Sequence, residues 1–438
     1  MPFVASLLDG PGRSIIPDDP AFGKMGRASM KEWTDFGLRH GPIMSARAPL
    51  VDMPDTLRTL LDPRLALLKH PLMGVHAGRD VQRGLFPLRA TGVSTEPILE
   101  AAWVFLEALS PEQRDRVCLP LDSEARRTWL NIHPNIFRNG LMLEDLSPDV
   151  RDLALALLRT TLSDRGFRQA RDIMRINGFL ADYTGRPDEY GEWPYFIAIF
   201  GDPSPDTPWG WQIDGHHLCL SCVVIGDQLV LAPAFMGSEP CVITSGPLAG
   251  VSTFVKEGRA GLDMIRSLDA ASAAKATLHA SILPDDLPED MQHPFDGRMV
   301  GGAFHDNARV DYAGVCGSDL SDQQRRLLMS LVGVYVDWTR DGHAGVKLRE
   351  VEQHLDETWF SWMGAIGDEG PFYYRVHSPV VLIEFDHHPG VVFDNVAPSP
   401  HHIHTMVRMP NGGDYGADLI RQHHDRFDHS HGDHRPRT

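Results

Sequence analysis

The chain has 438 residues, of which 42% are apolar and 23% charged. This composition is typical of globular proteins and excludes collagen-like, coiled-coil and wholly disordered chains. Lys and Arg number 41 against 59 for Asp and Glu, which gives a net charge of −18. Negative charge repels phosphate backbones and anionic lipid surfaces, so we expect neither a nucleic-acid nor a membrane partner.

Five cysteines at irregular spacing argue against a disulfide framework and favour a reducing compartment. The first twenty residues lack the basic start and apolar core of a signal peptide, and no later run is long and apolar enough to span a membrane. We therefore expect a cytoplasmic protein. A homo-oligomer is compatible with this composition.

The pattern divides the chain into three parts. Residues 1–95 are rich in Pro, Gly and Arg and predict an irregular extension with short helices near 57–68. Residues 96–425 predict one main domain. Residues 426–438 form a polar, histidine-rich tail without apolar periodicity, which predicts a flexible end.

Helices are predicted in three blocks of the main domain. Apolar residues recur at helical spacing over 98–109, and capping-box signatures begin further helices at Ser110 and Ser321. Ser147 before Pro148 marks another helix start, and helical patterns also cover 164–183 and 256–279.

Strands are predicted in two blocks, separated by the helices. The first comprises 195–200, 209–213, 217–225 and 228–233, with a hairpin turn at Gly226 and Asp227. The second comprises 359–363, 372–377, 380–386 and 402–408. Because strands and helices are segregated and not alternated, the predicted class is α+β, with antiparallel sheets flanked by helices. The sequence shows no internal repeat.

Histidine is unevenly distributed, and the pair His402 and His404 is its most informative feature. The two-residue period of a strand directs both side chains to one face, while Ile403, Thr405 and Val407 face the other way. Two imidazoles on one rigid strand can reach the same cation. The alternative is a pair of hydrogen-bonded imidazoles without a metal.

A third imidazole comes from the segment Asp214-Gly215-His216-His217 at the start of a strand. Strand parity places His217 on the more polar face, so we expect it to join His402 and His404 as a metal ligand. His216 shares the parity of the apolar positions; it is either a catalytic neighbour or a core histidine with one satisfied nitrogen.

Two further charged residues are candidates for catalysis. Glu384 interrupts an apolar strand, and a buried carboxylate is costly unless it is paired, protonated or metal-bound, so we expect it to be a fourth ligand or a general base. Arg408 continues the face of the two histidines and could bind an anionic substrate through its planar fork. Its alternative is an ion pair with Glu384 or Asp414.

Two other features have a structural and a functional interpretation. Cys219 and Cys222 are three apart in a strand and hence on opposite faces, so we expect two buried thiols and not a zinc pair. Aromatic residues gather in 209–211, 359–362 and 372–374, where core packing is favoured over a pocket wall for a ring-bearing substrate.

A combination of motifs resembles an uncharacterised family of bacterial and fungal proteins, domain of unknown function number 3500. The motifs are Phe-Gly-Asp-Pro-Ser at 200–204, Pro-Trp-Gly-Trp at 208–211, Gly-His-His-Leu at 215–218, Leu-Ile-Glu-Phe-Asp at 382–386, His-Ile-His-Thr at 402–405 and Asp-Tyr-Gly at 414–416. The resemblance covers roughly 98–425 and implies one continuous globular unit. It supplies no activity or cofactor.

The residues themselves favour a mononuclear metal-dependent enzyme. One divalent transition metal (zinc, iron or copper) on His217, His402 and His404 would activate water for hydrolase or lyase chemistry on a small organic substrate, aromatic or anionic in character. Iron or copper would instead support dioxygen-dependent oxidation. A non-catalytic binding protein and a metal-free acid–base enzyme are the remaining alternatives.

Overall fold

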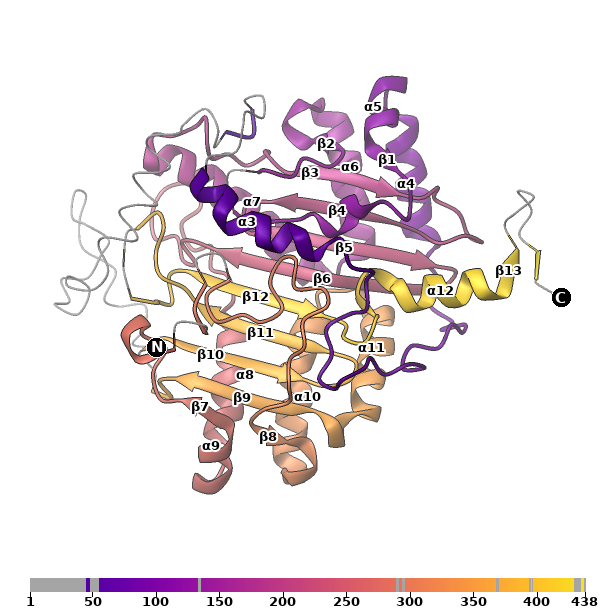
Figure 1. Ribbon diagram of the computed structural model, residues 1–438. Helices are drawn as coiled ribbons and strands as arrows, with labels where there is room; N and C mark the ends of the chain where they lie inside the picture. The colour runs from indigo at the N-terminus through magenta and orange to yellow at the C-terminus, as the bar shows by residue number, and fades with distance from the viewer. Residues whose placement is uncertain are drawn as a thin grey trace.

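A computed structural model describes residues 45–47, 55–132, 135–288, 291–293, 296–367, 370–393, 395, 397–428 and 435–436 (Figure 1). Its centre is one 12-stranded sheet with the strand order β1-β3-β4-β5-β6-β12-β11-β10-β9-β7, in which β2 also pairs with β3 and β8 with β9. The eight long strands are β3 (Phe196–Phe200), β4 (Trp209–Gly215), β5 (Leu218–Ile225), β6 (Gln228–Ser238), β9 (Trp359–Gly364), β10 (Phe372–His377), β11 (Leu382–His387) and β12 (Ile403–Arg408). The short strands are β1 (Cys118–Leu119), β2 (Leu141–Met142), β7 (Thr277–His279) and β8 (Val315–Cys316).

Five of the described α-helices begin at a residue whose side chain caps the first turn. Ser110 and Ser321 both form complete capping boxes, and Ser147 and Ser163 accept hydrogen bonds from the first turns of the helices that follow them. The described helices are α3 (Asp55–Leu67), α4 (Glu96–Glu107), α5 (Pro111–Val117), α6 (Pro148–Thr161), α7 (Asp164–Thr184), α8 (Val255–Arg266), α9 (Ala270–Ala276), α10 (Asp322–Val336), α11 (Asp341–Gln353) and α12 (Ala417–Arg426).

The main domain consists of two halves with the same order of elements. Each half has two helices, a short strand parallel to its first long strand, a short antiparallel strand, two more helices and a four-stranded antiparallel meander. The first half ends in β3 to β6 and the second in β9 to β12, and β6 pairs with β12 to join them. The expectation of no internal repeat is therefore wrong at the level of architecture.

The strand registers make the correspondence of the halves residue by residue. Ile213 lies opposite Leu220 in the first half, as Val376 lies opposite Ile383 in the second. Following the meanders outward, Ala234 and Val407 are equivalent positions, and they pair directly with each other across the β6–β12 junction. An approximate twofold axis therefore passes between these two strands.

The two faces of the sheet have different covers. The long helices pack behind it, as Figure 1 shows, and share a core with residues such as Trp211 and Phe385. The opposite face carries Cys219, Phe235 and Met406, and is covered by α3 and by irregular segments. Alternation along each strand decides which side chain reaches which layer.

The predicted class, α+β with antiparallel sheets and segregated helices, is confirmed. The short helix predicted near 57–68 corresponds to α3, whereas residues 1–44 and 48–54 of the predicted extension lie outside the described residues, as do 429–434 and 437–438 of the tail. Cys219 and Cys222 are both buried thiols and belong to the cores on opposite faces. Among the described residues, no helix has the length and apolarity that a membrane crossing requires.

Two glycines at equivalent places in the halves test the repeat. Gly140 (φ +86°) and Gly314 (φ +97°) would place a Cβ within 1.9 Å of the Ile197 carbonyl oxygen and 2.0 Å of the Phe360 carbonyl oxygen, respectively. We expect Gly140→Ala and Gly314→Ala each to lower the free energy of unfolding by more than about 3 kcal/mol, through positive-φ strain and backbone overlap. Urea unfolding provides the measurement.

The matched control is Gly226→Ala. Gly226 also has a positive φ (+58°), but no atom lies within 4 Å of the position of its missing Cβ. The control should therefore lose only about 1 kcal/mol, from backbone strain alone. Equal losses in all three variants would contradict the overlap.

Candidate metal centre

Three buried imidazoles converge near the junction of the two halves. Nε2 of His402 lies 3.1 Å from Nε2 of His217 and 2.9 Å from Nε2 of His404. One ligand atom from each histidine lies within 4.8 Å of those of the other two. A metal–nitrogen distance of about 2.0–2.1 Å places two ligating nitrogens about 2.9 Å apart at a right angle and about 3.4 Å apart at the tetrahedral angle. The observed separations lie in or near that range.

The β6–β12 pairing brings His404 against the turn that carries His217. Gly237 of β6 is the register partner of His404, and its backbone N–H donates to the His217 carbonyl oxygen over 2.8 Å. A Cβ at Gly237 would lie 2.9 Å from Cδ2 of His404 and 3.1 Å from Cδ2 of His217. Only a residue without a side chain lets the two rings approach this closely.

His217 owes its position to a turn and not to strand parity. His216 and His217 connect β4 to β5, and His217 has a left-handed backbone with φ of 61°. Its N–H donates to the carbonyl oxygen of Asn131 over 3.0 Å, which holds the turn. The predicted strand start at 217 is therefore one residue early, although His217 does face His402 and His404.

The tautomer of His402 suits a ligand. Its Nδ1 lies 2.6 Å from the carbonyl oxygen of Pro389, which can only accept a hydrogen bond. The proton is therefore on Nδ1, and Nε2 directs its lone pair toward the other two rings. Glu239 lies 3.7 Å from the same Nδ1 and accepts backbone hydrogen bonds from 391–393, which fixes the segment beside His402.

Two more imidazoles enclose the three. His216 stacks on His217 with ring centroids 4.0 Å apart, and Nδ1 of His216 donates to Asn177 Oδ1 over 2.8 Å. The His388 ring lies 3.8 Å from that of His404, and its Nε2 is 2.9 Å from Asp386 Oδ2. Asp386 in turn is held by two contacts from the Arg298 guanidinium, at 2.6 and 3.0 Å.

Burial favours the neutral form of three of these rings. Desolvation, followed by the neighbouring imidazoles, lowers the pKa of His217, His388 and His404 well below the usual value. A neutral imidazole is the form that binds a metal. Nδ1 of His404 has no hydrogen-bond partner, so protein hydrogen bonds do not account for every nitrogen of the cluster.

Glu384 does not reach the three histidines. Its Oε1 accepts from the Tyr373 hydroxyl and from the Val300 N–H, and its Oε2 accepts from the Gly301 N–H, all over 2.7 Å. These hydrogen bonds satisfy the carboxylate of Glu384 without a metal. Burial nevertheless raises the pKa of Glu384. The carboxylate of β11 that lies beside the cluster is Asp386, two residues further along the same face of the strand.

Arg408 is an internal cross-link and is not directed at a substrate. Its side chain is fully buried, and Nη1 contacts Asp306 at 2.9 Å and Asp414 at 3.0 Å. Nε and Nη2 donate to the carbonyl oxygens of Gly301 and Gly302. The alternative of an ion pair with Asp414 is therefore the one observed, and the expected anion-binding role has no free edge of the guanidinium to serve it.

The sequence interpretation missed His388. It stands at the position after Asp386 and His387, and shares even-numbered parity with Glu384 and Asp386 on β11 and with His402 and His404 on β12. Extending the alternation by one step past the strand would have found it.

The site occurs in only one of the two halves. By the strand registers, His217 corresponds to Val380 and His404 corresponds to Val230. Valine cannot ligate a metal, so the architecture is repeated and the candidate centre is not.

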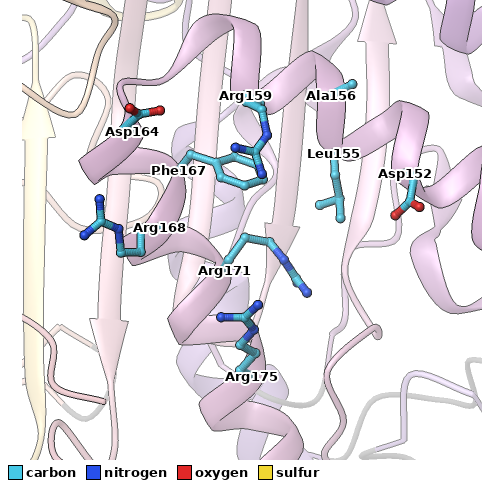
Figure 2. Close-up of a pocket in the computed structure, with 9 residues that line it drawn as sticks. All are labelled: Asp152, Leu155, Ala156, Arg159, Asp164, Phe167, Arg168, Arg171 and Arg175. Atoms are coloured by element: carbon cyan, nitrogen blue, oxygen red, sulfur yellow. The ribbon is translucent and has the colours of Figure 1, made fainter. Parts of the chain in front are cut away.

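A separate cleft of about 600 Å³ lies between α6 and α7 (Figure 2). Its charged lining consists of Asp152, Arg159, Asp164, Arg168, Arg171 and Arg175. Arg171 is paired with Glu192 at 2.5 Å and Arg175 with Asp172 at 3.3 Å. The cleft is lined by none of the clustered histidines and lies in the helical layer, so it is not the entrance to the candidate centre.

The fold and the site define an α+β protein with a buried three-histidine cluster at the junction of two similar halves. Residues 91–417 match the family described as "Protein of unknown function (DUF3500)". The chain belongs to this family, as the motif resemblance implies. Comparisons with curated proteins and with solved structures find no match.

The surroundings of Arg408 generate a stability prediction. Arg408→Met leaves Asp306 and Asp414 buried without their shared cation, and we expect a loss of about 3–5 kcal/mol in the free energy of unfolding. The control is Arg309→Met, whose ion pair with Asp311 is exposed; it should stay within about 0.5 kcal/mol of wild type. Chemical denaturation of both variants measures the difference, and a stable Arg408→Met protein would contradict the cross-link.

Proposed function

We propose that His217, His402 and His404 bind one divalent transition-metal ion and that the protein is a mononuclear metal-dependent enzyme. The observation that carries the proposal is the convergence of three buried imidazole nitrogens at separations compatible with one ion. His217 comes from a turn, and His402 and His404 come from a distant part of the chain at β12. The pairing of β6 with β12 holds them together and gives the rigid ligand set that a metal site requires.

The number of ligands favours a catalytic over a structural metal. Among the residues that the structure describes, the cluster comprises three histidines and no fourth His, Cys, Asp or Glu. Structural zinc sites are closed by four protein ligands, whereas catalytic sites keep a position for water or substrate. A bound divalent ion at such a position supplies Lewis acidity and lowers the pKa of water.

His388 is the best candidate for moving a proton at this site. Its ring contacts that of His404, and its Nε2 lies 2.9 Å from Asp386, which Arg298 holds in place. A carboxylate that fixes an imidazole is a common arrangement for general acid–base catalysis. In this proposal Glu384 and Arg408 support the site through packing and are not part of the reaction.

Hydrolase or lyase chemistry is our first assignment, with zinc as the metal. Three imidazole ligands suit zinc and equally suit copper or iron, and the latter two would support dioxygen-dependent oxidation of a small organic substrate. Elemental analysis separates these assignments because the chemistry follows the metal. A protein that binds the ion without turnover would show the metal and no rate.

Metal content is the direct test. In a chain with His429, His431 and His434 changed to Ser, which removes tail histidines that could bind metal adventitiously, we expect about one equivalent of a transition metal by elemental analysis. His404→Ala and His217→Ala should lose it while retaining the circular dichroism spectrum. His70→Ala, which alters an exposed histidine, is the control. Equal metal in the parent and in His404→Ala would reject the site.

Gly237 provides a second test that leaves all ligands in place. Gly237→Ala inserts a methyl group against the rings of His404 and His217, and we expect at least a tenfold loss of metal affinity, as for other changes just outside a ligand set. Competition with a chromophoric chelator measures it. In Gly258→Ala, the control, the nearest atom to the new Cβ is 3.5 Å away, so metal affinity should not change.

A further inference from the structure

A second polar cluster lies on the face of the sheet that α3 and the irregular segments cover. It takes no part in the proposed metal centre. Arg375 on β10 lies opposite Ser361 on β9, and His377 lies two residues further along β10 on the same face. Their exposed fractions are 7%, 1% and 1%, respectively. Arg375 and His404 are on strands separated by β11, so the two clusters are about 10 Å apart across the sheet.

The polar atoms of this cluster have no protein partners. Nε of Arg375, both ring nitrogens of His377 and Oγ of Ser361 are buried without a hydrogen bond. Among the described residues, no carboxylate lies within ion-pair distance of the Arg375 guanidinium. Glu384, its register partner on β11, turns its oxygens to Tyr373, Val300 and Gly301.

The Arg375 guanidinium is the unusual feature, because within the described part of the chain it has neither an ion pair nor a hydrogen bond, whereas Arg298 and Arg408 on the same face have both. Glu384 acts on Arg375 through its charge but offers it no acceptor, since the oxygens of Glu384 bind Tyr373, Val300 and Gly301. The missing partner is therefore a hydrogen-bond acceptor, to which all three side chains can donate. An oxyanion that enters the cluster supplies acceptors to all of them.

The charge of the cluster selects the class of oxyanion. Burial and the neighbouring Arg375 lower the pKa of His377 to about 3, so its ring is neutral at pH 7 and Arg375 contributes the one positive charge. A carboxylate carries one negative charge and presents two coplanar oxygens to a guanidinium fork, whereas a phosphate dianion would leave a charge uncompensated.

Two aromatic rings form one wall of the cluster. The Tyr312 ring lies 4.6 Å from that of His377 and is nearly parallel to the Trp359 ring, with centroids 6.2 Å apart. Both Tyr312 and Trp359 are partly exposed, so the wall extends from the buried polar atoms toward solvent. The charged groups that face this wall are Lys275, which lies over the Trp359 ring, and Glu357, which acts on Tyr312.

We propose that Arg375, His377 and Ser361 form a binding site for the carboxylate group of a small organic acid, with Tyr312 and Trp359 against its apolar part. The site does not depend on the metal centre and would exist in its absence. Arg375 supplies the counter-charge, His377 and Ser361 supply further donors, and the rings favour a carboxylate that carries an apolar group.

The test uses the full chain with sodium benzoate, sodium acetate and inorganic phosphate as probes at constant ionic strength. We expect benzoate and acetate to raise the unfolding temperature and to give a binding heat in calorimetry, with benzoate the tighter of the two. Phosphate should have a smaller effect than either. No response to any probe, or a preference for phosphate, would overturn the assignment.

Variants separate binding from folding. Arg375→Met should abolish the response to benzoate and should change the unfolding temperature of the free protein by only a few degrees, because the lost guanidinium makes no hydrogen bond or ion pair with any described residue and acts on Glu384 through its charge alone. Ser361→Ala removes a hydroxyl that makes no hydrogen bond and should fold normally, with benzoate affinity about 3- to 10-fold weaker. Arg259→Met, on an exposed helix surface, should respond like wild type.

Two outcomes contradict the proposal. If Arg375→Met unfolds at a much lower temperature than wild type, the guanidinium has a structural partner. If Ser361→Ala and Arg375→Met both bind benzoate as wild type does, benzoate binds elsewhere.

Discussion

The antiparallel pairing of β6 with β12 is the constraint on which the rest of the structure depends. It joins two four-stranded meanders that would otherwise each have an open edge, and it does so between equivalent residues, Ala234 and Val407. The same pairing places His404 opposite Gly237, and Gly237 next to the turn of His217. The candidate metal centre is thus a consequence of how the halves meet.

The two faces of the sheet differ in the charged groups that they bury. The helical face is packed with aliphatic and aromatic side chains from both layers. The other face buries several charged groups under α3 and irregular segments. The free-energy cost of removing each group from water is offset in a different way. Asp386 is held by Arg298 and Arg408 by two carboxylates, and burial favours the neutral form of His217 and His404. Arg375 has no ion pair among the described residues and has Glu384 only as a neighbouring charge.

The structural repeat lets equivalent positions in the two halves carry different residues. The two meanders share their registers apart from a β-bulge between Leu220 and Cys222 in the first, yet the positions of His217 and His404 are valines in the other half. One half of a symmetric scaffold can therefore keep apolar packing while the other carries ionisable groups, because stability is supplied by the whole sheet. The repeat is faint in the sequence, since the halves share alternation and element order together with scattered identities such as Gly140 with Gly314 and Ser147 with Ser321.

The sequence by itself determined the local features. Capping residues fixed helix starts, apolar alternation fixed the strands and their segregation from the helices, and the two-residue period placed His402 and His404 on one face. These depend on neighbours within a few positions along the chain. Only the tertiary structure decided which distant groups meet. Glu384 was a reasonable ligand by residue type, but its oxygens accept hydrogen bonds from the backbone of Val300 and Gly301. Arg408 forms ion pairs with Asp306 and Asp414. His388 contacts the cluster from the loop that follows β11. Such contacts follow from strand order and from the path of irregular segments, which no local pattern encodes.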